Sequence, residues 1–238
     1  MSFSEKALEL NVSENLVNLC RFLNSRAYLM GYTLKNESIH GLDVSLNVQN
    51  SILGPSFQFK KPRRRGNVFR FSINNNNNRD QHLRLYLLSH VFELVQNYSP
   101  IYYAFPTISS ANELNVLSPN FLRNTFFISP LSFPLSILDF NKHHVKIDTS
   151  TSTITVHSKS GTKISNYFKG FQILEEILLG YTKSKNIKLI KERFREINYK
   201  NILSDIIYND RKFVNKHIEK LFNKKWKIGL KGIIFPQE

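Results

Sequence analysis

Apolar and polar residues alternate with a period of two in several short stretches of the chain, a pattern that predicts β-strands with one buried face. The clearest example is VFRFSI at residues 68–73. In SFQFK at residues 56–60, two phenylalanines fall on one face while Gln58 and Lys60 fall on the other. The stretch LDVSLNV at residues 42–48 alternates in the same way. We expect these segments to be strands of one mixed sheet.

Elsewhere the spacing of apolar residues changes to three and four, which predicts helices. One helix is expected at residues 10–24, with Ser13 as a candidate N-cap, and another at residues 80–96. The other expected elements are a basic loop at 61–66, buried strands at 100–105 and 125–129, a hairpin of strands 143–148 and 153–158, and helices at 171–181, 186–197, 199–208 and 211–224. This order predicts an α/β fold, more narrowly an α+β arrangement with helices flanking a mixed sheet.

A boundary without a long linker is expected after the predicted hairpin. Residues 1–162 are expected to form the α/β core, and residues 163–238 a basic helical region packed on or beside it. With 238 residues, the chain is long enough to bury a proper core.

The net charge of +15 is confined to two segments. Residues 60–84 hold eight lysines and arginines against one acid, a net of +7, and residues 163–238 hold seventeen against eight, a net of +9. The remainder has a net charge of −1. Such local positive fields attract phosphate backbones and release their counterions, which favours nucleic acid as the partner. An anionic membrane surface and a composition biased toward Lys, Asn and Ile are the alternatives.

Cysteine usage and the terminal segment point to a reducing, cytoplasmic setting. Cys20 is the single cysteine, so no intramolecular disulfide can form, and it falls on the apolar stripe of the first predicted helix. The first eleven residues carry two acids and lack the apolar core of a signal peptide. No apolar stretch reaches the roughly 18 residues that a membrane span needs.

Three polar residues are candidates for chemistry. Asp43 lies in a strand-like stretch, where an acid is costly unless it has a partner, and Gln58 follows it by fifteen residues. If the two strands pair, Asp43, Gln58 and Lys60 converge on one spot. A hard divalent cation takes oxygen ligands such as the Asp43 carboxylate and the Gln58 amide oxygen. A lysine beside it can position a water and stabilise charge that develops on phosphate.

This arrangement resembles the PD-(D/E)xK nuclease superfamily, and more narrowly the Mrr-type restriction endonucleases, which use Gln in the second motif. The matching residues are Gly41-Leu42-Asp43-Val44 and Gln58-Phe59-Lys60, and the likeness covers roughly residues 10–106. It implies a restriction-endonuclease-like core and hydrolysis of DNA with Mg²⁺ or Mn²⁺, in defence against foreign DNA or in a mobile element. It further implies that Glu14 on the leading helix helps to hold the metal, and that Gln81 and His82 support the site from the helix that Asp80 opens.

The sequence departs from the family pattern in two ways. A neutral Gln58 stands where most relatives have an acid, and no proline precedes the first aspartate motif. The residues expected to hold the nucleic-acid backbone are basic side chains beside the motif: Lys61, Arg63, Arg64, Arg65 and Arg70. The pair His143-His144 is expected on a hairpin surface, with the two rings on opposite faces, rather than at a metal site.

Two other functions remain open at this point. One is a nucleic-acid-binding protein that keeps the nuclease fold without its chemistry, as the neutral Gln58 allows. The other is a helical interaction module in which residues 166–238 dock a protein partner and the basic charge is incidental. We expect DNA as the partner in the first instance, no membrane, and a homodimer as the candidate assembly.

Overall fold

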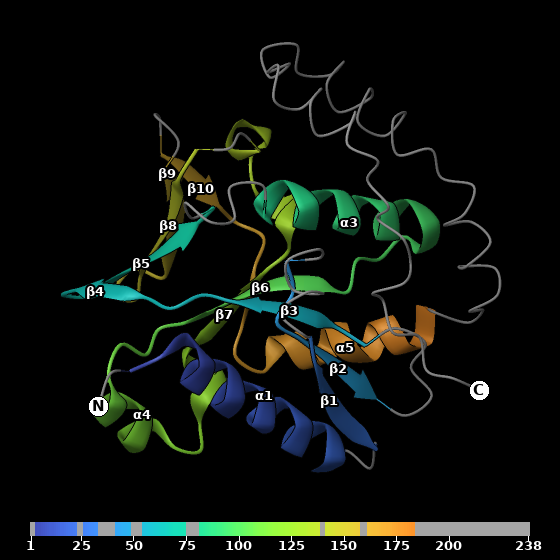
Figure 1. Ribbon diagram of the computed structural model, residues 1–238, viewed down its shortest axis with the longest axis horizontal. Helices are drawn as coiled ribbons and strands as arrows, with labels where there is room; N and C mark the ends of the chain where they lie inside the picture. The colour runs from blue at the N-terminus through green and yellow to red at the C-terminus, as the bar shows by residue number, and fades with distance from the viewer. Residues whose placement is uncertain are drawn as a thin grey trace.

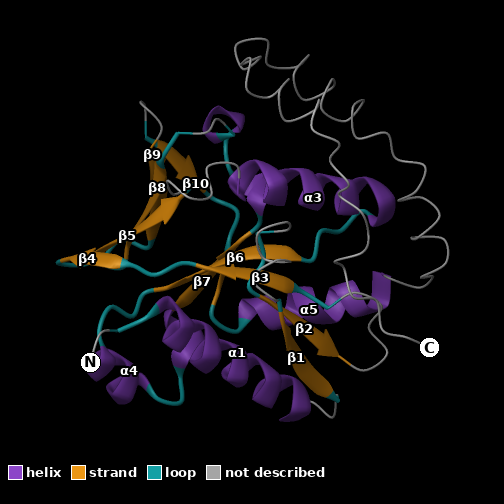
Figure 2. Cartoon of the chain, in the orientation of Figure 1, coloured by secondary structure: helices purple, strands orange, loops and turns teal. Residues whose placement is uncertain are grey.

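The computed structural model describes residues 3–22, 26–32, 41–48, 54–74, 81–138, 141–157 and 161–183. These residues form two β-sheets with helices packed against them, as Figures 1 and 2 show. The fold is therefore mixed α/β, as the spacing patterns predict. The predicted helices at 186–197, 199–208 and 211–224 lie outside the described residues.

The six-stranded sheet has the strand order β1-β2-β3-β6-β7-β11. Its strands are β1 (Ala27–Gly31), β2 (Val44–Val48), β3 (Ser56–Phe59), β6 (Ile101–Pro106), β7 (Thr125–Ile128) and β11 (Phe168–Lys169). All neighbouring pairs are antiparallel except β3 and β6, which run parallel. Parallel neighbours need a long crossover, and here it contains the first strands of the other sheet and a helix.

The five-stranded sheet is antiparallel throughout, with the order β10-β9-β8-β5-β4. Its strands are β4 (Arg63–Arg65), β5 (Val68–Ile73), β8 (His143–Asp148), β9 (Thr153–His157) and β10 (Thr162–Ile164). The strand predicted at 68–73 and the hairpin of 143–148 with 153–158 are confirmed. In Figure 1 this sheet extends to one side of the molecule, beyond the end of β3.

The helices cover both faces of the six-stranded sheet (Figure 1). They are α1 (Glu5–Phe22), α3 (Gln81–Gln96), α4 (Ala111–Leu117) and α5 (Gln172–Lys183), with 3₁₀ turns η1 (Phe121–Asn124), η2 (Pro130–Ser132) and η3 (Leu135–Ile137). One core lies between α3, the six-stranded sheet and the inner face of the five-stranded sheet. The other lies between α1, α5 and the opposite face of the six-stranded sheet.

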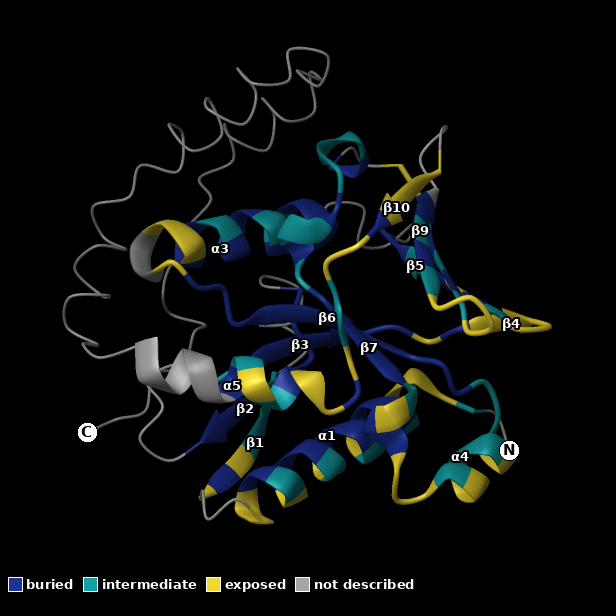
Figure 3. Cartoon of the chain, turned by 180° about the vertical axis from the view of Figure 1, so that it is seen from behind, coloured by how far each residue is buried: buried dark blue, intermediate teal, exposed yellow. Residues whose placement is uncertain are grey.

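The sequence of strand β6, IYYAFP, is apolar without alternation because the strand is buried on both faces. Tyr103 and Phe105 pack into the core under α3, whereas Tyr102 and Ala104 pack into the core under α1. A strand covered on both faces needs apolar residues at every position. Figure 3 shows β3, β6 and β7 buried along their lengths.

Helix α1 begins earlier than the expected residue 10. The Ser4 hydroxyl accepts a hydrogen bond from the Ala7 N–H at 3.1 Å, so Ser4 caps the helix and Ser13 is a buried residue within it. The apolar stripe extends upstream through Leu8 and Val12, which are both fully buried. The expectation of Ser13 as the N-cap is wrong, because the buried apolar stripe of the helix begins at Leu8, upstream of Ser13.

The segment expected as a basic loop at 61–66 contains strand β4. Arg63 and Arg65 pair with Arg70 and Val68 across a turn in which Gly66 has a φ of +61°, a left-handed conformation that glycine adopts without strain. β4 is an edge strand, and charged side chains are ordinary there because one side of the strand faces water. Alternation cannot reveal a strand of three consecutive arginines.

The expected boundary between residues 162 and 163 falls inside β10. Beyond it, β11 joins the six-stranded sheet, and Ile173 and Ile177 of α5 belong to the core under α1. The described part of the chain therefore continues as one packed structure past this point. Within that part, no helix is long and apolar enough to cross a membrane.

Candidate functional site

Strand pairing brings the three candidate residues together. Asp43 precedes β2, and its backbone N–H donates to the Phe57 carbonyl at 2.9 Å, while Val44 pairs with Phe57 in the register. The predicted adjacency of the two segments is confirmed. Phe57 and Phe59 enter the core under α1, so Gln58 and Lys60 lie on the opposite face of the strand, as their alternation predicts.

A buried chain of hydrogen bonds joins these side chains. Asp43 Oδ2 accepts from Gln58 Nε2 at 2.8 Å and from the Phe59 N–H at 2.7 Å. Gln81 Nε2 donates to Gln58 Oε1 at 2.8 Å, and Gln81 Oε1 accepts from Lys60 Nζ at 2.7 Å. Gln81 is the first residue of α3, so the helix and two strands meet at this point.

Gly41 gives Gln81 room to reach the strands. Its φ is +72°, and a Cβ at this position would lie 3.1 Å from Gln81 Cγ. The Gly41 carbonyl also accepts a hydrogen bond from Gln81 Nε2 at 3.3 Å. A side chain at residue 41 would be strained by its backbone and would press on Gln81, which explains the glycine two residues before Asp43.

The cluster is closed to solvent on most sides. Asp43 is 9% exposed, Lys60 8%, Gln81 3% and Gln58 2%. Burial raises the pKa of Asp43 to about 7, against the lowering effects of the Lys60 charge and the Phe59 N–H. The carboxyl group therefore changes protonation near neutral pH, and a cation beside it would favour its ionised form.

The acids on α1 that act on this site are Glu5 and Glu9. Both raise the pKa of Asp43 through their charge, and Glu9 is buried at the same end of the helix. Glu9 forms an ion pair with Lys6, and Glu5 Oε2 accepts from the Lys61 N–H at 2.7 Å. Glu14, the expected metal-binding acid, is exposed farther along α1.

His82 lies next to Gln81 in sequence but faces another environment. It is fully buried, with its Nδ1 3.1 Å from the Tyr103 hydroxyl and its ring edge-on to Phe133. Burial lowers its pKa to about 3, so the ring is neutral. The described contacts place it in the core under α3 and not in the hydrogen-bonded chain of the site.

The expected backbone-binding residues are exposed but differ in their surroundings. Arg63, Arg65 and Arg70 take part in none of the ion pairs of the described residues, whereas Arg64 pairs with Glu113 of α4. The Lys61 ammonium donates to the Phe3 carbonyl. Four of these residues lie within five positions after Lys60, and the fifth, Arg70, pairs with Arg63 across the turn between β4 and β5.

The oxygen atoms of the site suit a hard cation. Within the described residues, no hydrogen bond reaches Asp43 Oδ1. Gln58 turns its amide NH₂ toward Asp43 and its oxygen toward Gln81, so its amide must rotate before the oxygen can join a cation. No group of three or more His, Cys, Asp or Glu with metal-binding geometry occurs in the described part of the chain.

The two other candidates from the sequence behave as side chains of the fold. Burial raises the pKa of the Cys20 thiol to about 11, which fits its place in the core under α1. His143 is buried and His144 half-buried, on opposite faces of β8. The expectation of a surface position is wrong for His143, because the inner face of β8 packs into the core under α3.

Comparisons of the chain with protein-family models, with curated proteins and with solved structures gave no match.

Proposed function

We propose that the chain is a metal-dependent nuclease that hydrolyses DNA phosphodiester bonds at Asp43, Gln58 and Lys60. The main observation that supports this proposal is the buried chain of hydrogen bonds that links these three residues to Gln81. Burying an acid, two amides and an ammonium group costs free energy, and apolar residues could fill the same volume at less cost. Their presence together therefore supports a functional role for the cluster.

The order of elements supports the same proposal. A helix, three strands, a helix and a strand follow one another as α1, β1, β2, β3, α3 and β6, with β4 and β5 inserted after β3. The last of these strands runs parallel to β3. This order matches the helix, strands, helix and strand expected from the resemblance to PD-(D/E)xK nucleases. Asp43 immediately precedes β2, Gln58 lies on β3, and Lys60 immediately follows β3.

The residues of the site have separable roles in the proposed reaction. A water loses a proton to solvent as its oxygen attacks phosphorus and one P–O bond breaks, and the displaced oxygen takes up a proton from solvent and leaves on the cut strand. Asp43 and Gln58 would hold Mg²⁺ or Mn²⁺, with Glu9 adding negative charge nearby, and the bound ion would lower the pKa of water and neutralise charge on the phosphate. Lys60 stabilises the charge that develops on phosphorus oxygens, and Gln81 fixes the direction of the Lys60 ammonium.

The test is cleavage of supercoiled plasmid with Mg²⁺ or Mn²⁺, with a chelator as the blank. Lys60→Ala should abolish nicking, because it removes the ammonium next to the reacting phosphate. Lys169→Ala removes the same charge from an exposed position on β11, three strands from β3 in the six-stranded sheet, and should keep the activity. Both variants should bind duplex DNA nearly as tightly as the wild type, since one of many cations contributes little to non-specific affinity.

Gln58→Glu separates the nuclease from its binding-only alternative. The new carboxylate would stand where an amide now donates to Asp43 at 2.8 Å, so the variant should be less stable without a cation and bind Mn²⁺ more tightly. Activity should survive. A wild type that binds DNA but cuts no duplex or single strand with either metal, and a Gln58→Glu variant that is equally silent, would establish the binding-only function.

A further inference from the structure

The register of the five-stranded sheet aligns basic residues from four of its strands in one transverse row. Arg63 of β4 pairs with Arg70 of β5, and Arg70 pairs with Lys146 of β8. Lys146 pairs with Thr155 of β9, which in turn pairs with Lys163 of β10. Directly paired residues of antiparallel strands project on the same face. We call these five side chains the cationic row.

The row lies on the outer face of the sheet. Each strand alternates, so the neighbours Phe69, Phe71, Val145, Ile147, Ile154 and Ile164 are buried in the core under α3. Arg63, Arg70 and Lys163 are exposed, and Lys146 and Thr155 are partly exposed. With neighbouring strands about 4.8 Å apart, the four steps from β4 to β10 extend over about 19 Å.

The cations of the row have no acidic partners in the described part of the chain. The ion pairs there are Lys6–Glu9 and Arg64–Glu113, and neither involves the row. Asp148 is the acid on the same face of β8, and its carboxylate accepts from the Ser150 N–H and hydroxyl at 2.9 and 2.6 Å. Desolvation, followed by the charges of Arg70, Lys142 and Arg63, lowers the pKa of His144 to about 4.

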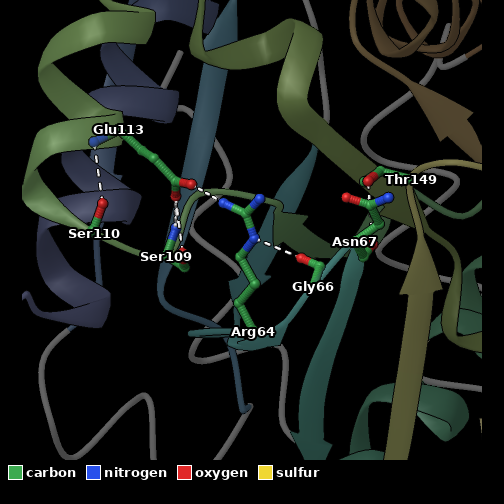
Figure 4. A network of polar contacts seen from close by, with 7 residues as sticks. All are labelled: Arg64, Gly66, Asn67, Ser109, Ser110, Glu113 and Thr149. Atoms are coloured by element: carbon green, nitrogen blue, oxygen red, sulfur yellow. Dashed lines mark hydrogen bonds and ion pairs between the residues drawn. The ribbon is translucent and has the colours of Figure 1, made fainter.

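Arg64, the central residue of β4, is held by contacts within the protein. It pairs with Phe69 on the inner face, where its guanidinium lies 5.2 Å from the ring centroid, and it binds Glu113 and the Gly66 carbonyl (Figure 4). Glu113 is held in turn by the Ser109 N–H and hydroxyl at 2.7 and 2.9 Å. These contacts tie the β4 edge to α4 and fix the end of the row.

We propose that the cationic row binds the phosphate backbone of duplex DNA beside the cleavage site. The inference rests on the proposed function for the identity of the ligand. Arg63 follows Lys60 by three residues, so the chain places the start of the row within about 10 Å of the proposed catalytic lysine. A duplex held at the cleavage site would extend along this face, and its backbone would meet one cation after another.

The neighbours of the row favour a duplex over a single strand. Outward positions on β5, β8 and β9 whose side chains are described are Val68, Ser72, His144, Asp148 and Thr153. Half-buried His144 is the one ring among them, and none is Phe, Tyr or Trp, the larger aromatic side chains on which unpaired bases stack. A five-stranded face is also too wide for a groove that admits a helix or a two-stranded ribbon, so contact is with the backbone and independent of sequence.

The test measures how duplex affinity depends on salt, in a chelator so that nothing is cut. Lys146→Gln together with Lys163→Gln should lower the slope of log affinity against log salt by about 1.8, since each lost phosphate contact removes about 0.9. The matched control is Arg26→Gln with Lys169→Gln, which removes two exposed charges, one just before β1 and one on β11 of the six-stranded sheet. Its slope should equal that of the wild type, and all three proteins should show the same thermal unfolding midpoint.

Four results would overturn the inference. The first is an equal loss of slope in the row variant and the control, and the second is tighter binding to a single strand than to a duplex of the same length. The third is no duplex binding by the wild type. The fourth is binding to anionic phospholipid vesicles that depends on the row, without any binding to duplex. Plasmid cleavage distinguishes the two proposals. If the wild type cuts and the row variant keeps its slope, only the row fails; if the row variant loses slope and no protein cuts, only the nuclease fails.

Discussion

The substitution Asp43→Asn tests whether the charge of the buried Asp43 carboxylate lowers the free energy of unfolding. The substitution conserves shape, and the asparagine Oδ1 can accept the two hydrogen bonds from Gln58 Nε2 and the Phe59 N–H that Asp43 Oδ2 now accepts. What it removes is a carboxylate at 9% exposure. The variant should therefore fold as the wild type does and be more stable above neutral pH.

The expected gain follows from the pKa of Asp43. Burial raises this pKa from 3.8 to about 7, so the native state binds more protons than the unfolded chain between those values. The contribution of Asp43 to the stability of the wild type is then fully present below pH 3.8 and is lost as the pH rises through about 7. At about 1.4 kcal/mol per pKa unit, the loss is about 2 kcal/mol at pH 5 and about 4 kcal/mol at pH 8.

The assay is urea unfolding followed by far-UV circular dichroism at pH 5 and pH 8, in a chelator. Asp43→Asn should exceed the wild type at both values and by more at pH 8, because asparagine does not titrate. The control is Asp148→Asn, at a partly exposed acid whose pKa is lowered by the Ser150 hydrogen bonds, and it should give no gain at pH 8. A difference between Asp43→Asn and wild type that is absent at pH 8, or the same at both values, refutes the reasoning.

Adding a cation extends the same experiment to function. Mn²⁺ at a hundred times its dissociation constant should stabilise the wild type by about 2.7 kcal/mol, since it binds the folded state alone. Asp43→Asn should show no such gain, because the charge that holds the ion is gone. Equal stabilisation of both proteins would place the cation elsewhere in the chain.

Two further predictions concern charges around the site. Glu9→Gln should weaken Mn²⁺ binding and plasmid cleavage because it removes a buried negative charge that acts on Asp43, whereas Glu14→Gln on the exposed face of α1 should change neither; the Mn²⁺ titration midpoints of the two variants decide. Arg64→Gln should leave the salt slope of duplex binding unchanged because its guanidinium is engaged by Glu113, whereas Arg63→Gln should lower the slope by about 0.9. A slope that falls more for Arg64→Gln than for Arg63→Gln would contradict the assignment of faces.

The sequence alone was sufficient for elements with a clear period. Alternation in VFRFSI predicts β5, and the unbroken apolar run IYYAFP predicts a buried strand at β6. The convergence of Asp43, Gln58 and Lys60 was predictable as well, because pairing of two alternating strands brings their polar faces together. Gln81 was predicted to support the site, but its position between Gln58 and Lys60 depends on how α3 packs, which periodicity does not give.

Other features needed the three-dimensional structure. The resemblance implies Glu14 as the metal-binding acid of α1, whereas Glu5 and Glu9 are the acids of α1 whose charge acts on Asp43, and Glu9 is buried beside Leu8 and Val12. An acid within an apolar stripe carries a desolvation cost, and that cost was the available signal for Glu9. The cationic row could not be foreseen, because Lys146 and Lys163 are far from the arginine strand in sequence and meet it only through the register of five strands.

Helix α3 contacts both the proposed cleavage site and the sheet that carries the cationic row. Its first residue, Gln81, hydrogen-bonds Lys60 in the site, and its apolar face shares a core with the inner face of the five-stranded sheet. Buried Pro62 is the one residue between exposed Lys61 and Arg63, so the chain leaves the site and enters the row without a long loop. A backbone bound by the proposed row would therefore lie close to Lys60, because α3 packs against the five-stranded sheet and its first residue binds Lys60. Positioning of this kind raises the rate of a reaction whose chemistry is supplied by a few groups, because the reacting bond spends more time in place.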